Sequence, residues 1–184
     1  MNKNLGTLKI LPVMNNLALV ALPTASFLKS LSNADSEVGV SEIDAALSDT
    51  AAFCEHYQVD LARTANCIVI KASRGDKNWY AACIVFGNAR ADVNGLIRRH
   101  LGARKASFAP MDEATTLTGM EYGGITPVGL PADWPILIDK AVADSAEVVI
   151  GSGLRKSKLI VTGNFLAHLP NAVVLDHLGA IEMN

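Results

Sequence analysis

The chain has 184 residues and a mass of 19.5 kDa, which is about the length of one domain. Half of its residues are apolar and 18% are charged, which excludes a disordered chain. The net charge of −2 excludes a protein that coats nucleic acid by charge alone. It still allows a nucleic-acid substrate that the protein binds at one end. Three cysteines without a CxxC pair are a poor disulfide framework, so we expect a reducing, cytoplasmic location.

Residues 1–40 are predicted to form an arm or extension packed on the domain that residues 41–184 make. The apolar stretch 17–22 gives the amino terminus a faint likeness to a signal peptide, but Pro12, Asn15 and Asn16 interrupt the apolar run before it. No window approaches the ~20 apolar residues that span a bilayer. We therefore expect no membrane partner.

The first elements that the sequence predicts clearly are a helix and a hairpin. Residues 41–44 resemble a capping box, so we predict a helix from there to about His56. The β-branched run 66–71 predicts a buried strand. A second run at 79–86 follows the polar residues 73–78, which predicts an antiparallel hairpin with a six-residue loop.

Later segments alternate short helices with strands. Asp92 is expected to cap a helix that runs to His100 and ends at Gly102. The remaining predictions are a helix at 112–117 that stops at Gly119, a loop at 123–131, strands at 136–139, 147–150, 158–162 and 172–175, and a helix to Leu169 capped by Thr162 or Asn164. This order predicts an α/β fold of the α+β type, with a mixed, largely antiparallel sheet flanked by helices.

Common catalytic motifs do not occur. The four histidines lack HxxxH and HExxH spacing, and no cysteine pair has metal-ligand spacing. There is no GxSxG elbow and no phosphate loop. Gly151-Ser152-Gly153 opens like a dinucleotide fingerprint, but Lys156 takes the place of its last glycine. We expect no metal site and no cofactor.

Lys71 stands out because it ends an otherwise apolar strand. Strand alternation places Cys67, Val69 and Lys71 on one face. The ammonium then either reaches water at the strand end or enters a pocket, where it could bind a phosphate or a polarised carbonyl.

Two glycine-containing loops and one basic cluster are further candidates. Residues 123–127 (Gly123, Gly124, Ile125, Thr126 and Pro127) form either an ordinary tight connection or a pocket wall with free N–H groups. Residues 151–153 form either a plain turn or a nest of N–H groups. The basic residues form either a solvated face or a contact to an RNA backbone; they are Arg98, Arg99, Arg104 and Lys105.

Together these segments resemble the YbaK/ProX family, the free-standing relatives of the editing domain of bacterial prolyl-tRNA synthetase. The resemblance runs from about residue 66 to 169 and rests on Lys71, residues 103–110, the GGxxPxG loop at 123–129 and residues 149–155. Thr126 stands where relatives often have serine, and Asn164 lies near a position where relatives often carry a carboxylate.

The resemblance implies a mixed sheet curled into a barrel-like core, and an aminoacyl-tRNA deacylase that removes small amino acids, such as alanine or cysteine, from tRNA for proline. It implies Lys71 as the essential lysine and the loop at 123–127 as the substrate-binding loop. The acceptor end of aminoacyl-tRNA would be the partner, and an aminoacyl-tRNA synthetase a second one. The resulting hypothesis is that the N–H groups of the loop and Ser152 bind the substrate while a positioned water attacks the ester without a metal.

Two other functions stay open from the sequence. A non-catalytic module that binds the aminoacyl end as a sensor predicts binding without turnover. A small-ester hydrolase that uses Asp139 and a histidine predicts activity on simple esters.

Overall fold

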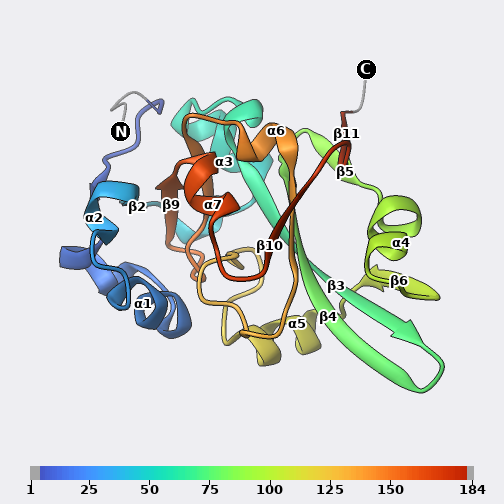
Figure 1. The fold of residues 1–184 in the computed structure, drawn as a ribbon. Helices are drawn as coiled ribbons and strands as arrows, with labels where there is room; N and C mark the ends of the chain where they lie inside the picture. Colours follow the sequence, from blue (N-terminus) through green and yellow to red (C-terminus); the bar gives the residue numbers. More distant parts are fainter. Residues whose placement is uncertain (1–4, 182–184) are drawn as a thin grey trace.

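A computed structural model describes residues 5–181 (Figure 1). In chain order the elements of this part are β1 (Leu11–Pro12), η1 (Met14–Leu19), α1 (Leu22–Lys29), α2 (Ala34–Glu37), β2 (Val38–Glu42), η2 (Ala45–Leu47), α3 (Thr50–Tyr57), η3 (Leu61–Arg63), β3 (Ala65–Arg74), β4 (Lys77–Phe86), β5 (Ala89–Ala91), η4 (Val93–Ile97), α4 (Arg98–His100), β6 (Lys105–Phe108), α5 (Met111–Thr118), β7 (Ile136–Asp139), α6 (Lys140–Ala143), β8 (Val148–Gly151), β9 (Ser157–Val161), α7 (Gly163–Ala167), β10 (Ala172–Leu175) and β11 (Gly179–Ile181). No helix within residues 5–181 has the length and apolarity needed to cross a membrane.

The strands form a five-stranded sheet in the order β10-β7-β4-β3-β6, a four-stranded sheet in the order β1-β2-β9-β8 and the pair β11-β5. All neighbours are antiparallel except β4–β7 and β7–β10, which confirms the mixed, largely antiparallel prediction. A bridge between Thr64 and Val149 joins the two larger sheets. None of the sheets within residues 5–181 closes on itself, so the prediction of a barrel-like core is wrong.

The β3–β4 hairpin is longer than the sequence predicts. Ten residues of each strand pair in register, from Ala65 with Phe86 to Arg74 with Lys77. Only Gly75 and Asp76 remain for the turn, and Gly75 has a φ of +60°, which suits a two-residue hairpin turn. The predicted six-residue loop is wrong. The end of the hairpin projects into solvent, where polar residues form the backbone pairing of a strand as readily as apolar ones do (Figure 1).

The helix predicted over residues 41–56 begins later. Ser41 and Glu42 lie in β2 and pair with β9, so tertiary pairing overrides their local capping pattern. The side chain of Asp49 instead accepts hydrogen bonds from Ala51 N and Ala52 N at the start of α3. Other cap predictions are confirmed: Asp92 caps η4, the left-handed Gly119 ends α5 and Thr162 caps α7.

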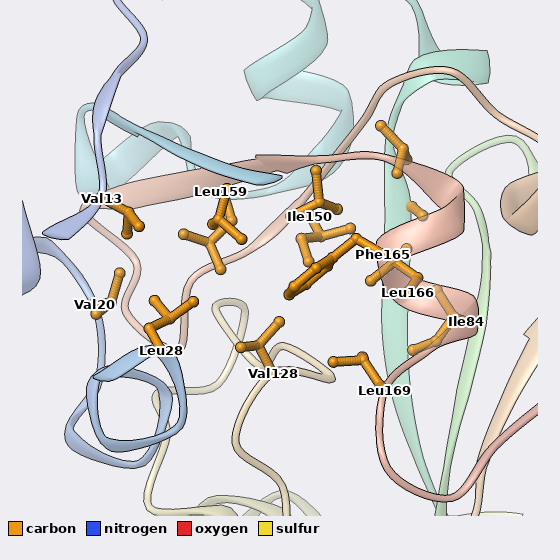
Figure 2. Close-up of a cluster of buried hydrophobic side chains, with 14 of the residues drawn as sticks. Val13, Val20, Leu28, Ile84, Val128, Ile150, Leu159, Phe165, Leu166 and Leu169 are labelled. Carbon is orange, nitrogen blue, oxygen red and sulfur yellow. The ribbon is translucent and has the colours of Figure 1, made fainter. Parts of the chain in front are cut away.

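The main hydrophobic core combines the N-terminal segment with both larger sheets. Val13, Val20 and Leu28 pack in one cluster with Ile150 of β8 and Leu159 of β9. Figure 2 shows these side chains converging with those of the α7 region and with Val128 of the glycine-containing loop. Residues before position 40 therefore contribute buried side chains to the core. The strand β2 includes residues on both sides of position 40.

Candidate functional site

A cavity of about 420 Å³ lies where the two larger sheets meet. The lining comes from β3, β8, β9, the start of α3, the end of β6, and α5 with the loop after it. The lining residues are Ser48, Asp49, Thr50, Phe53, Thr64, Ala65, Asn66, Cys67, Ile68, Val69, Phe108, Ala109, Ala114, Tyr122, Gly123, Ile125, Val149, Ile150, Gly151 and Lys158. Its volume lies in the range of small-molecule sites.

Polar groups form one part of the lining. Lys158 of β9 is 8% exposed, and its Nζ donates a hydrogen bond of 3.0 Å to the backbone oxygen of Ser48. Thr50 Oγ1 donates to Asn66 Oδ1 at 2.8 Å, which leaves the Asn66 amide nitrogen outside this bond. Within residues 5–181, no hydrogen-bond partner lies near the buried hydroxyl oxygen of Ser48. The cavity thus offers both donors and an unpaired hydroxyl to a ligand.

Apolar side chains form the rest of the lining, and the cavity cysteine is not a ready nucleophile. Burial raises the pKa of the Cys67 thiol well above its usual range, and the nearby Cys83 adds to this shift. A thiol that stays protonated at neutral pH is a poor nucleophile. At the surface, Phe108 is 63% exposed and Tyr122 is 59% exposed. The lining of the cavity therefore includes two exposed aromatic side chains.

The predicted glycine-containing loops meet at this cavity but contribute unequally. Gly123, Ile125 and Gly151 line it. The other predicted loop residues are buried in the packing of the loops and do not belong to the lining; they are Gly124, Thr126, Pro127, Ser152 and Gly153.

Contacts between the two loops explain their glycines. A Cβ on Gly151 would lie 2.4 Å from the Gly124 carbonyl oxygen. Gly153 N donates to that same oxygen at 2.7 Å, and Gly124 N donates to Glu121 O at 2.9 Å. These N–H groups, which the sequence suggests as substrate donors, are thus used inside the protein. The Ser152 hydroxyl is likewise engaged, since it accepts from Ser157 Oγ at 2.7 Å.

Lys71 lies on the β3–β4 hairpin, outside the lining of the cavity. Its Nζ is 2.7 Å from Glu113 Oε1 of α5, and Tyr80 OH donates to Glu113 Oε2 at 2.6 Å. The hydrogen bond to Glu113 raises the pKa of Lys71, and the same bond lowers the pKa of Glu113. The Tyr80 ring stacks on Trp134 with 5.4 Å between the ring centroids, which fixes the tyrosine that binds Glu113.

The basic cluster lies around α4 and β6. Arg98 Nε donates to Asn94 O at 2.8 Å, whereas Arg99, Arg104 and Lys105 are exposed. Lys105 begins β6 and Phe108 ends it at the cavity. Since a strand rises about 3.3 Å per residue, roughly 10 Å separates the two positions.

Asp139, the candidate acid of an ester hydrolase, uses its carboxylate in hydrogen bonds to the backbone. Its Oδ1 accepts from Ala141 N and its Oδ2 from Gly179 N. The four histidines do not occur among the residues that line the cavity. Within the described part of the chain, no three His, Cys, Asp or Glu side chains gather as metal ligands.

The sequence between residues 44 and 169 matches the family model of the aminoacyl-tRNA editing domain. The chain belongs to this family. The matched region holds most of the cavity, including both glycine-containing loops and Lys158. No curated protein matches the sequence of this editing domain.

Solved structures share the fold of the editing domain. A crystal structure described as a candidate trans-editing enzyme for prolyl-tRNA synthetase is similar at a TM-score of 0.71 and 21% identity, covering 91% of this chain and 98% of the other. A scaffold protein from work on epitope grafting is similar at a TM-score of 0.71 and 22% identity, covering 85% and 95%. The hypothetical protein APE2540 is similar at a TM-score of 0.68 and 19% identity, covering 77% and 90%. Identities this low establish a common fold.

Sequence reasoning missed the lysine of the editing domain that lines the cavity. Lys158 lies in the apolar run Ser157–Val161, where alternation places it on the same face as the buried Ile160. The pattern that singles out Lys71, a cation in a buried strand, also singles out Lys158. No sequence pattern marks Thr50 and Asn66 as site residues, because only the tertiary packing of α3 on β3 brings their side chains together.

Proposed function

We propose that this editing domain hydrolyses the ester bond of mischarged aminoacyl-tRNA, with small amino acids such as alanine or cysteine on tRNA for proline as substrates. The observation that carries the proposal is the cavity of about 420 Å³ within the family-matched region, whose lining contains polar donors and two exposed aromatic side chains. The trans-editing description of a structural neighbour supports the choice of tRNA.

The chemistry needs a positioned water and stabilisation of the carbonyl oxygen. Water adds to the ester carbon while the electron pair of the carbonyl moves onto its oxygen. Collapse of this intermediate breaks the bond to the ribose oxygen, which takes a proton, and the amino acid leaves as a carboxylate with one proton released to solvent. An aminoacyl ester is already reactive, so binding and electrostatics supply much of the rate. We propose no metal in this step.

The cavity wall favours small acyl groups. Gly123 and Gly151 present backbone to the cavity where other residues would project a side chain, and Ile125 adds a branched apolar wall. Apolar walls discriminate by size only modestly, at roughly 1–3 kcal/mol per methylene. We therefore expect a preference for small amino acids over large ones.

The surface around the mouth suits the end of an RNA strand. Exposed aromatic rings stack on bases at ~1–3 kcal/mol each. In this proposal the exposed Phe108 and Tyr122 stack on the terminal adenine. Arg104 and Lys105 at the far end of β6 then lie where they can neutralise backbone phosphates of the acceptor stem. The mild net acidity of the chain implies modest affinity, which delivery by a synthetase would compensate.

The test is deacylation of alanyl-, cysteinyl-, seryl- and prolyl-tRNA for proline by the purified protein, with Lys71→Ala in parallel. Turnover of the small aminoacyl esters above the uncatalysed rate is the expected result. Loss of turnover in Lys71→Ala would support the catalytic role that the family resemblance implies for this lysine. Binding of the aminoacyl end without turnover of any ester would instead identify a binding module.

A further inference from the structure

We propose that Lys158 is the cation of the editing site and that its ammonium binds the carbonyl oxygen of the aminoacyl ester, on which negative charge develops during hydrolysis. This inference rests on the proposed function and names a residue for it. It assigns to β9 a role that the predicted site residues did not include.

The first observation is that Lys158 is buried with few partners. Its exposed fraction is 8%, and one N–H of the ammonium donates to Ser48 O at 3.0 Å. The Phe53 ring centroid lies 5.2 Å from Nζ. No carboxylate of residues 5–181 forms an ion pair with Lys158. Two of the three N–H groups of this buried cation thus have no hydrogen-bond acceptor among residues 5–181.

The second observation is the position of this cation in the cavity lining. Lys158 lines the cavity together with Ser48, whose buried hydroxyl oxygen lacks a hydrogen-bond partner among the described residues. Burying a charge without a counter-charge costs several kcal/mol, and apolar side chains of similar volume often replace such charges without loss of stability. Because β9 keeps a lysine where an apolar residue would pack, an acceptor from the substrate is the group that completes the site.

The surrounding charges are consistent with an oxygen ligand that carries partial negative charge. Burial lowers the pKa of Lys158, and the Arg155 guanidinium lowers it further, whereas Asp49 and Cys54 of the α3 region act in the opposite direction. Asp49 is an exposed cavity residue whose carboxylate caps α3. A developing oxyanion close to Nζ would stabilise the charged ammonium and be stabilised by it.

Lys71 offers a matched comparison. It is also a lysine in a strand, but its ammonium already has a carboxylate partner, Glu113, at 2.7 Å and lies outside the cavity lining. Of these two strand lysines, Lys71 forms an ion pair with a carboxylate and Lys158, within the described part of the chain, does not. Only the second has unused donors at the cavity.

The experiment compares Lys158→Met, Lys158→Gln and Lys140→Met with the wild type in single-turnover deacylation of the best substrate from the tRNA panel. Lys140 is the control because it is an exposed lysine, paired with Asp144 at 2.6 Å, that lies outside the cavity lining. Removing an oxyanion donor typically lowers kcat about 10²–10³-fold, so Lys158→Met should lose this factor. Lys158→Gln, which keeps a neutral donor, should recover part of it, and Lys140→Met should stay within about threefold of the wild type. Circular dichroism and thermal unfolding check that each variant is folded.

A second measurement separates this inference from the proposed function. Binding of a non-hydrolysable analogue, in which an amide replaces the ester at the terminal adenosine, is measured by calorimetry for the wild type and Lys158→Met. An at least tenfold weaker Kd for the variant supports the role of Lys158 even when the wild type turns over no ester. Turnover and Kd of folded Lys158→Met within twofold of the wild type overturn the inference while leaving the editing function intact. A wild type that neither hydrolyses nor binds overturns both.

Discussion

Two strand lysines show how much the surroundings of a residue decide its chemistry. Lys71 and Lys158 both interrupt apolar strands, and in the sequence they differ little. In the folded protein Lys71 is partly exposed and paired with Glu113, whereas Lys158 is buried with a backbone oxygen as its acceptor. The first lysine is electrostatically satisfied by the protein, and the second leaves donor capacity for a ligand.

The pair of Lys71 and Glu113 should give the stability a defined pH dependence. The pKa of Glu113 is lowered from about 4.5, so its contribution exists above that pH and is lost as the pH falls through the lowered value. The pKa of Lys71 is raised from about 10.5, so its contribution exists below that pH and is lost as the pH rises through the raised value. We expect Glu113→Gln to lower the Tm modestly between about pH 5 and 10, because the pair is partly exposed.

Thermal unfolding over a pH series measures this effect. The difference between wild type and Glu113→Gln should begin to shrink as the pH falls below about 4.5 and should disappear as the carboxylate is protonated at its lowered pKa. The double variant with Lys71→Met should lose little more than either single variant, since the two residues share one interaction. A Tm difference that stays constant with pH would show that the substitution acts through packing alone.

Among the elements, the two glycine-containing loops position the cavity wall by packing on each other. Gly124 lies against the backbone of Leu154, and Gly151 lies against the carbonyl oxygens of Gly124 and Ile125. Glycine is required at these positions because backbone approaches backbone, and the loops' N–H groups are partly used in this packing. The wall of the site is therefore a property of both loops together.

Gly124→Ala should separate the loops. Its Cβ would lie 2.6 Å from the Leu154 carbonyl carbon, so we expect a destabilisation of about 1–3 kcal/mol and reduced deacylation. Denaturant unfolding and the deacylation assay measure the two effects. Gly75→Ala is the control, because a Cβ there meets nothing within 4 Å and its left-handed φ of +60° adds only local strain far along the hairpin. Equal effects of both variants on activity would contradict this account of the wall.

For the whole molecule, the N-terminal segment contributes to the core. Leu28 of α1 is fully buried against residues of both larger sheets, and Thr24 Oγ1 donates to Val128 O in the loop beyond the cavity wall. The strand β2, which spans position 40, pairs with β9 and so joins the N-terminal segment to the rest of the chain. The division of the chain into an arm and a domain stays a prediction that stability measurements can address.

Two leucines of α1 provide that measurement. Leu28→Ala should lower the free energy of unfolding by about 2–5 kcal/mol, because it leaves a cavity in the main core. Leu22→Ala, at a position 84% exposed, should change it by no more than about 0.5 kcal/mol. Chemical unfolding of both variants gives the comparison. A small loss for Leu28→Ala would show an arm that is energetically separable from the core.

The sequence by itself determined the family and part of the local elements. Apolar periodicity located β7 and β10, side-chain caps located the starts of η4 and α7, and the glycine-containing loops indicated the editing family, because each signal lies within a few residues of chain. Tertiary structure decided the rest. Strand pairing moved Ser41 out of a predicted helix and left the sheets open, and burial separated Lys158 from Lys71. Both outcomes depend on contacts between residues distant in sequence, which set desolvation and charge pairing and which no local pattern contains.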